Sequence, residues 1–183
     1  MERTTGLGTP REIDGIAHQL HHAHEGEPWH GPSVTKVLEN ITAAEAATRP
    51  IVGAHTIWEI TLHIAAWRGE VARRLETGRL ADPLEGDWPE VPPPGTAEEN
   101  EANWVAAKER LATAEAALQK ALQAFPAERL AETFGGERDA PLGSGTTYGV
   151  MLRGVAQHDA YHSGQIVLVR KAIKAADPPQ GTA

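Results

Sequence analysis

The chain of 183 residues contains no cysteine. This absence rules out disulfide bonds, thiolate metal ligands and a cysteine nucleophile, so a metal site must use histidine or carboxylate side chains. No apolar run approaches the roughly 20 residues that a membrane-spanning helix needs. Residues 1–6 lack the apolar segment of a signal peptide. We therefore expect a cytoplasmic protein that does not enter a membrane.

An excess of basic residues is also missing. The 17 lysines and arginines are outnumbered by 25 aspartates and glutamates, which gives a net charge of −8. A nucleic-acid-binding protein needs a basic surface to replace the counterions around phosphates, so we expect no nucleic-acid partner. The content of 40% hydrophobic and 23% charged residues is typical of a soluble domain. We expect residues 1–183 to form a single domain, because this length suffices for one core.

Strand signals are weak, whereas helical periodicity is strong. An apolar stripe at helical spacing predicts a first helix over residues 10–25, formed by Ile13, Ile16, Ala17 and Leu20. Residues 33–40 and 42–48 are expected to be short helical turns. Thr56 and Glu59 have the spacing of a capping box, which predicts that the second long helix begins there and ends near Gly78.

The second half of the chain predicts two more long helices. A second capping box opens the third helix at Thr96, and Trp104, Leu111, Leu118 and Phe125 recur every seven residues along it up to Pro126. Residues 127–145 are expected to be an irregular return loop, and residues 147–175 the fourth helix.

The proline-rich residues 79–95 are expected to cross over between the second and third helices without regular structure. About 17 residues can reach some 50 Å, whereas a helix of 21 residues is about 31 Å long. The linker is therefore long enough to let the third helix run parallel to the second. These elements predict an all-α fold, a four-helix bundle.

Histidine is abundant, with nine copies against two tyrosines and two phenylalanines. His158 and His162 are four residues apart in the helix expected at 147–175, so their side chains lie on one face. His63 borders the apolar stripe of the helix expected at 56–78. If these two helices are antiparallel and level at their ends, all three histidines come to one height at about 1.5 Å per residue.

Three neutral imidazoles around an ion leave one coordination position open, which is the arrangement of a catalytic metal site. The alternative is that each is a hydrogen-bonded core residue, the usual role of a single buried histidine. Burying three clustered imidazoles without partners is costly, so the cluster favours a metal bound by His63, His158 and His162. A metal-free bundle with three core histidines remains open at this point.

Other polar residues are candidates for the wall of a pocket near this cluster. His55 begins the second helix, about 12 Å along the axis from His63 and too far to share an ion. Tyr161 and Gln165 share the general face of the ligands, and His30 lies in a loop between turn-forming residues. His55 could cap the mouth of the pocket and His30 could hold a substrate or a proton, whereas packing is the default role of Tyr161 and Gln165.

Several further residues are given structural roles. Glu59 is expected to be the capping acid rather than a general base, and Asp159 to pair with the first helix or a surface group. His21, His22 and His24 are expected on a solvated face of the first helix, and the alternative places His22 and Gln19 near the mouth of the site. The loop with Trp29 and His30 either lines an opening above the core or places Trp29 as a plug over it. Trp58 and Leu62 form a second apolar strip that meets another helix or a partner subunit.

Four segments carry a resemblance to the DinB-like superfamily of bacterial four-helix bundles: Trp29–Pro32, Ala54–Glu59, His63–Trp67 and His158–Ile166. The resemblance implies an up-down-down-up bundle, a metal site formed by His63, His158 and His162, and nickel, zinc or a similar divalent ion. Some related families are S-transferases that use a low-molecular-weight thiol, and others are described as metal-dependent hydrolases. Homodimers are common among them.

These observations leave more than one function open. The first hypothesis is a metal-dependent enzyme acting on a small molecule, either by hydrolysis or by S-transfer from a low-molecular-weight thiol. Because the chain lacks cysteine, that thiol must be a cosubstrate. The alternative is a non-catalytic stress-response or binding protein that a metal stabilises.

Overall fold

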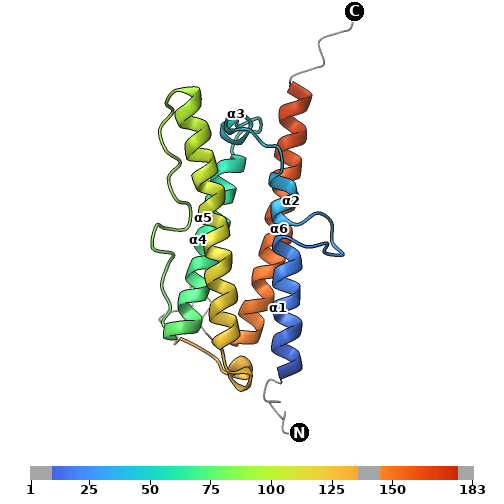
Figure 1. Cartoon of the computed structure of the whole chain (residues 1–183), viewed down its shortest axis with the longest axis vertical. Coiled ribbons are helices and arrows are strands. Elements are labelled where there is room, and N and C mark those ends of the chain that lie inside the picture. Colours follow the sequence, from blue (N-terminus) through green and yellow to red (C-terminus); the bar gives the residue numbers. More distant parts are fainter. Residues whose placement is uncertain (1–9, 136–144, 177–183) are drawn as a thin grey trace, which may run out of the picture.

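The computed structural model describes residues 10–135 and 145–176. The regular elements within these ranges are all helices. The long helices, which lie side by side in Figure 1, are α1 (Pro10–His24), α4 (Ile57–Thr77), α5 (Ala97–Ala124) and α6 (Tyr148–Ala176). The short ones are α2 (Val34–Leu38), α3 (Ala43–Ala47) and the 3-10 helix η1 (Ala127–Ala131). The predicted all-helical fold is confirmed, although η1 occupies part of the stretch expected to be irregular.

Both predicted capping boxes fix the starts of helices. The Thr56 hydroxyl accepts a hydrogen bond from the Glu59 amide, and the Glu59 carboxylate accepts one from the Thr56 amide at 2.7 Å. Thr96 and Glu99 repeat this exchange at the start of α5. At the other end of α4, Gly78 has a φ of +67°, a left-handed conformation that glycine adopts without a steric penalty.

Residues 79–95 contain no regular helix or strand. Figure 1 shows this linker, in green, returning along the outside of α4 and α5 to the end of the bundle where α5 begins. The α4–α5 interface is the most extensive contact between two elements of the described chain. No helix among the described residues is both long and apolar enough to span a lipid bilayer.

The core consists of two apolar clusters along the bundle. Trp104 is fully buried in the first, and its indole N–H donates to the Ile41 carbonyl at 2.7 Å, which ties α5 to the α2–α3 connection. Trp58 packs against Trp104 at 5.3 Å, and Leu62 is buried beside it. The second apolar strip of α4 therefore meets another helix of the same chain, one of the two expected outcomes.

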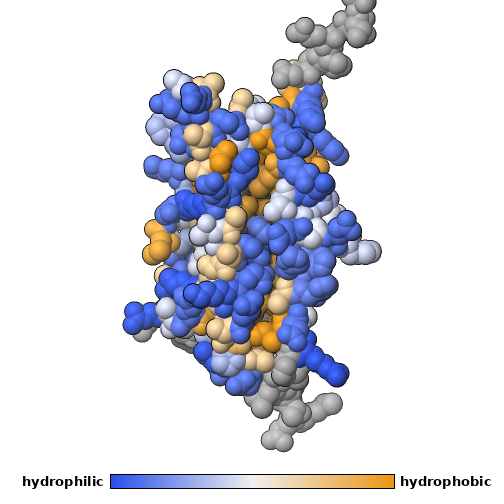
Figure 2. Space-filling view, viewed as in Figure 1, coloured by the Kyte–Doolittle hydropathy of each residue, from blue (hydrophilic) through white to orange (hydrophobic). Residues whose placement is uncertain are grey.

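The surface is mostly hydrophilic, as Figure 2 shows for one face. A band of apolar residues is visible there along the line between α5 and the helices beside it. Parts of α6 lie at the surface, since its apolar residues Val150 and Leu168 are 57% and 63% exposed. Some of its apolar side chains are thus free to line surface pockets.

A buried ion cluster connects three helices. Arg68 of α4 contacts the carboxylates of both Glu115 on α5 and Asp159 on α6, and its side chain is 1% exposed. The expectation that Asp159 pairs with the first helix or a surface group is therefore wrong. The side of α6 that carries Asp159 is also covered by neighbouring helices, so its carboxylate needs a cation inside the bundle.

His24 differs from the expected solvated face of α1. His21 is exposed and lies 3.1 Å from Glu25, whereas His24 is only 3% exposed. It is the last residue of α1, which packs against both α2 and α6 at this end. Burial, followed by the nearby charge of Arg68, lowers the pKa of His24 to about 3. His24 is therefore a neutral core residue.

Replacing the buried cation tests the ion cluster. Arg68→Met should lower the free energy of unfolding by about 3–5 kcal/mol, because two carboxylates would remain buried without a counterion. Urea denaturation followed by circular dichroism measures this change. Lys36→Met is the control, since it removes the cation of an exposed Lys36–Glu39 pair and should leave stability unchanged. Similar midpoints for the two variants would contradict the role given to Arg68.

Candidate metal centre

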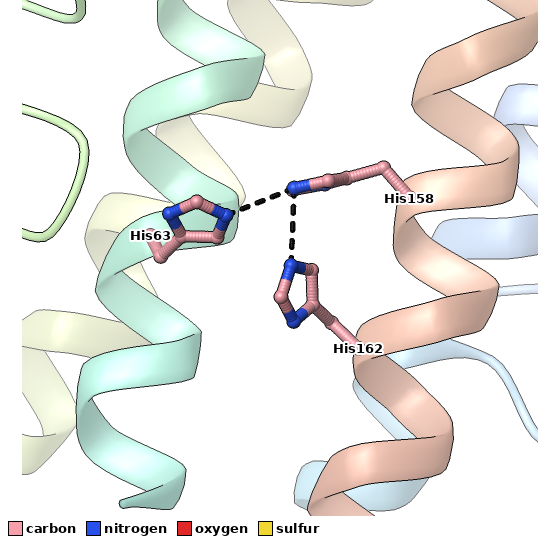
Figure 3. A group of neighbouring side chains, drawn as sticks. All are labelled: His63, His158 and His162. Atoms are coloured by element: carbon pink, nitrogen blue, oxygen red, sulfur yellow. Dashed lines mark hydrogen bonds between the residues drawn. The ribbon is translucent and has the colours of Figure 1, made fainter. Parts of the chain in front are cut away.

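Three imidazoles meet between α4 and α6 (Figure 3). His158 Nε2 lies 2.9 Å from His63 Nε2 and 3.1 Å from His162 Nε2. One ring nitrogen from each histidine falls within 4.8 Å of the others, and no other such group of metal-ligating side chains occurs among the described residues. The four-residue spacing on α6 brings the rings of His158 and His162 to 4.3 Å, and the packing of α4 on α6 adds His63.

The outer nitrogens of two rings are fixed by acceptors. His63 Nδ1 donates to the backbone carbonyl of Asp87 at 2.6 Å, and His162 Nδ1 donates to Gln165 Oε1 at 2.6 Å. A neutral imidazole carries a single proton, so hydrogen at Nδ1 leaves Nε2 as a bare lone pair. Asp87 and Gln165 therefore orient two lone pairs toward the centre of the cluster.

The cluster has too few protons to satisfy its own contacts. His158 Nε2 can donate one hydrogen, to either His63 or His162, and the lone pair of the other ring is then left without a donor. Burial lowers the pKa of His158 to about 3 and of His162 to about 4, and it also lowers the pKa of His63. The rings therefore stay neutral near pH 7, which is the form that binds a metal.

The spacing of the nitrogens fits one small divalent ion. Ligands bound tetrahedrally at 2.0–2.1 Å lie about 3.4 Å apart. The observed separations of 2.9 and 3.1 Å need to widen by only a few tenths of an ångström. Hydrogen bonds from the outer nitrogens of ligating histidines to carbonyl or carboxylate groups are also usual around bound metals. The residues present thus fit a three-histidine metal site.

Two linker residues complete the surroundings of His63. The Trp88 ring stacks on His63 at 4.0 Å on one side and on His55 at 3.4 Å on the other. Asp87 accepts hydrogen bonds from His63 through its carbonyl and from the Trp67 indole through its carboxylate. Sequence reasoning missed Asp87 and Trp88. The one available signal was a tryptophan inside an otherwise proline-rich linker.

The four expected pocket residues lie at different distances from the cluster. Gln165 contacts His162 directly, and the exposed Tyr161 ring approaches His162 edge-on at 5.0 Å. His55 is separated from His63 by Trp88. His30 is exposed and lines a surface pocket that also includes Tyr161 and Gln165. The structure therefore brings Gln165 into contact with the cluster but places His30 outside it.

Two expectations for the first helix and its loop are corrected. Trp29 is fully exposed, so it does not plug the core. His22 and Gln19 line a pocket with Arg153, and none of the three clustered histidines lines that pocket. His22 Nδ1 accepts a hydrogen bond from the Glu27 amide at 3.2 Å. This side of the molecule is thus not the mouth of the candidate site.

Comparison with known proteins identifies a family. The family model described as the DinB superfamily matches residues 30–166, which include all three clustered histidines. No curated protein and no solved structure matches the sequence significantly. The match therefore agrees with the resemblance seen in the sequence but names no reaction.

The neutral state of the cluster predicts an acid dependence of stability. The folded pKa values of these histidines lie below the 6.5 of an unfolded chain, so acid favours the unfolded state, which takes up the protons. For metal-free protein, the free energy of unfolding should fall as pH drops from about 6.5 toward 4, by up to about 1.4 kcal/mol per pH unit for each histidine. Urea denaturation with a chelator present measures this slope.

A variant comparison isolates the cluster from other titrating groups. His158→Gln should reduce the slope, because one buried neutral histidine is lost. His21→Gln should not, because His21 is exposed and lies outside the cluster. Equal slopes in the two variants would contradict the interpretation.

Proposed function

We propose that this chain, which belongs to the DinB superfamily, binds one divalent cation through His63, His158 and His162. The observation that carries the proposal is the convergence of three Nε2 atoms with at most one proton among them. A cation replaces the repulsion between lone pairs with three bonds. The lowered pKa values mean that few protons compete for these nitrogens near neutral pH.

The ligand set favours nickel or zinc as the cation. Imidazole nitrogen suits zinc, copper, iron and nickel, whereas magnesium and calcium prefer oxygen ligands. No thiolate competes, since the chain has no cysteine. Asp87 meets His63 Nδ1 rather than its Nε2, so it supports a ligand instead of acting as one.

The proposed activity is metal-dependent chemistry on a small molecule. Three protein ligands leave room for an exogenous one, and a divalent cation in such a site supplies Lewis acidity. Two reactions are compatible with this arrangement: hydrolysis, and S-transfer from a low-molecular-weight thiol. The absence of cysteine supports an external thiol in the second case. Turnover that requires added thiol would distinguish S-transfer from hydrolysis.

The alternative function is a metal-stabilised binding or stress-response protein. The cation would then join α4 to α6 without supporting turnover. The lone-pair repulsion in the metal-free cluster also supports this role, because relieving it stabilises the fold. A large rise in thermal stability with metal, together with no turnover of ester, amide or electrophilic thiol-acceptor substrates, would favour this alternative.

We also propose an up-down-down-up order for the four long helices. The path of residues 79–95 in Figure 1, back along the α4–α5 pair, supports it. The proposed assembly is a cytoplasmic homodimer, and the fully exposed apolar side chains of Trp29 and Val52 support a partner surface. Size-exclusion chromatography with light scattering would test the dimer.

Removing one ligand tests the metal site. Wild-type protein purified without a histidine tag and reconstituted with zinc or nickel should hold one metal per chain, whereas His162→Ala should hold clearly less, because two imidazoles remain. Elemental analysis by mass spectrometry measures the ratio, and circular dichroism checks that the variant stays helical.

The exposed His21 provides the matched control, since His21→Ala removes an imidazole that lies outside the cluster. Its metal content should equal that of the wild type. Equal metal loss in both variants would overturn the assignment.

The Gln165 oxygen that accepts the hydrogen bond from His162 Nδ1 should affect how tightly the protein binds the metal. Gln165→Met keeps the side-chain volume but removes the oxygen that orients Nδ1–H, so affinity should fall about 10–100-fold while the ratio stays one per chain. Competition with a chromogenic chelator measures the affinity. Gln157→Met, an exposed glutamine on the same helix, should change nothing. An unchanged affinity in Gln165→Met would rule out the orienting role.

A further inference from the structure

A small pocket of about 270 Å³ lies between the segment before α4 and the side of α6. Its walls are formed by Ile51, Gly53, Ala54, His55, Ile60, Gln165, Leu168 and Val169. The volume corresponds to about nine waters at roughly 30 Å³ each, enough for one aromatic ring with a substituent. The pocket is thus too small for a large ligand but suits a compact group.

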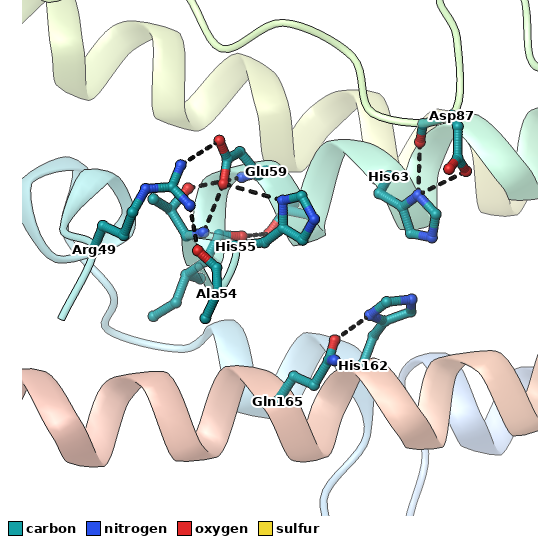
Figure 4. A network of polar contacts seen from close by, with 11 residues as sticks. Arg49, Ala54, His55, Glu59, His63, Asp87, His162 and Gln165 are labelled. Atoms are coloured by element: carbon teal, nitrogen blue, oxygen red, sulfur yellow. Dashed lines mark hydrogen bonds and ion pairs between the residues drawn. The ribbon is translucent and has the colours of Figure 1, made fainter. Parts of the chain in front are cut away.

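Two lining residues connect the pocket to the histidine cluster. Gln165 accepts the hydrogen bond from His162 Nδ1, and His55 stacks on Trp88, whose other face contacts His63. In Figure 4, His55 and Gln165 project from opposite sides into the gap that also separates His63 from His162. The pocket is therefore joined to the histidine cluster through Gln165 and through the stack of His55 on Trp88, although none of the three clustered histidines lines it.

The walls exclude charge. None of the lining residues is an aspartate, glutamate, lysine or arginine, and most are aliphatic. The nearest ion pair joins Arg49 to Glu59 at 2.6 Å, and neither of these two residues lines the pocket. In the metal-free protein, an ionised ligand would lose hydration here without gaining a counterion from the walls, which is costly. The pocket therefore favours an uncharged, apolar group.

His55 adds one directed polar contact. Its Nδ1 lies 3.3 Å from Glu59 Oε2, while Arg49 holds the other carboxylate oxygen. In the neutral ring, a hydrogen on Nδ1 that faces the carboxylate leaves His55 Nε2 as a hydrogen-bond acceptor. The stack with Trp88 fixes the plane of the ring. The pocket thus offers an acceptor to a ligand that carries a donor.

We propose that this pocket is the substrate subsite of the metal centre, and that it takes a compact, uncharged, apolar group whose single hydrogen-bond donor binds His55 Nε2. The assignment as a substrate subsite rests on the proposed metal-dependent function. The pocket itself is formed by protein atoms alone, so its ligand preference can be measured with and without metal.

Phenol, anisole and benzoate are suitable probes. Phenol has the donor, anisole lacks it, and benzoate adds a charge. Titration followed by protein NMR should show phenol binding about fivefold more tightly than anisole, which is the usual worth of one hydrogen bond, and benzoate binding more weakly than phenol. The imidazole nitrogen signals of His55 should shift with phenol. Equal affinity for phenol and anisole would overturn the role of His55.

Two variants locate the binding. His55→Phe retains a ring to stack on Trp88 but removes the acceptor, so it should abolish the preference for phenol and spare anisole. Leu168→Trp should fill the pocket and abolish binding of both. Val150→Trp, at another exposed apolar position on α6, is the matched control and should bind like wild type. If Leu168→Trp bound phenol and anisole as tightly as the wild type does, the probes would not bind in this pocket and the proposal would be wrong.

Metal analysis separates the two proposals. Phenol binding that persists in chelator-treated protein and is lost in Leu168→Trp supports the pocket, even if elemental analysis finds no metal and contradicts the proposed function. Stoichiometric metal without selective phenol binding contradicts the pocket and leaves the metal site standing.

Discussion

The shortage of protons among three facing nitrogens is the constraint on which the centre of this protein depends. His63 and His162 each have their hydrogen drawn outward by an acceptor, so His158 faces two lone pairs with one hydrogen to give. Burial prevents relief by protonation, since it lowers the pKa of all three rings. A cation bound between the three nitrogens, as we propose, would relieve this shortage.

The bundle holds this arrangement through a second polar cluster. Arg68, Glu115 and Asp159 join α4, α5 and α6 within the core, and Asp159 directly follows His158 of the histidine cluster in the sequence. Because buried ions tolerate little displacement from their partners, this cluster limits how α4 and α6 can rotate relative to each other. The same restriction fixes how His63 on α4 faces His158 and His162 on α6.

Much of this arrangement could be predicted from the sequence. The helices follow from capping boxes and apolar periodicity, and the His158–His162 pair follows from its four-residue spacing. Other features had no such signal. The Arg68 cluster depends on how three helices are rotated, and the burial of His24 depends on how α2 packs against the end of α1. Asp87 and Trp88 lie in a linker without periodicity, where sequence gives no position in space.

The crossover between α4 and α5, residues 79–95, does more than connect the two helices. Its residues Asp87 and Trp88 contact His63 from outside the bundle, while α4 and α6 carry the three clustered histidines. The cluster and the residues that orient His63 therefore come from separate stretches of chain, of which only the helices must also pack a core. Substitutions in the crossover can thus change the surroundings of His63 without repacking the helices.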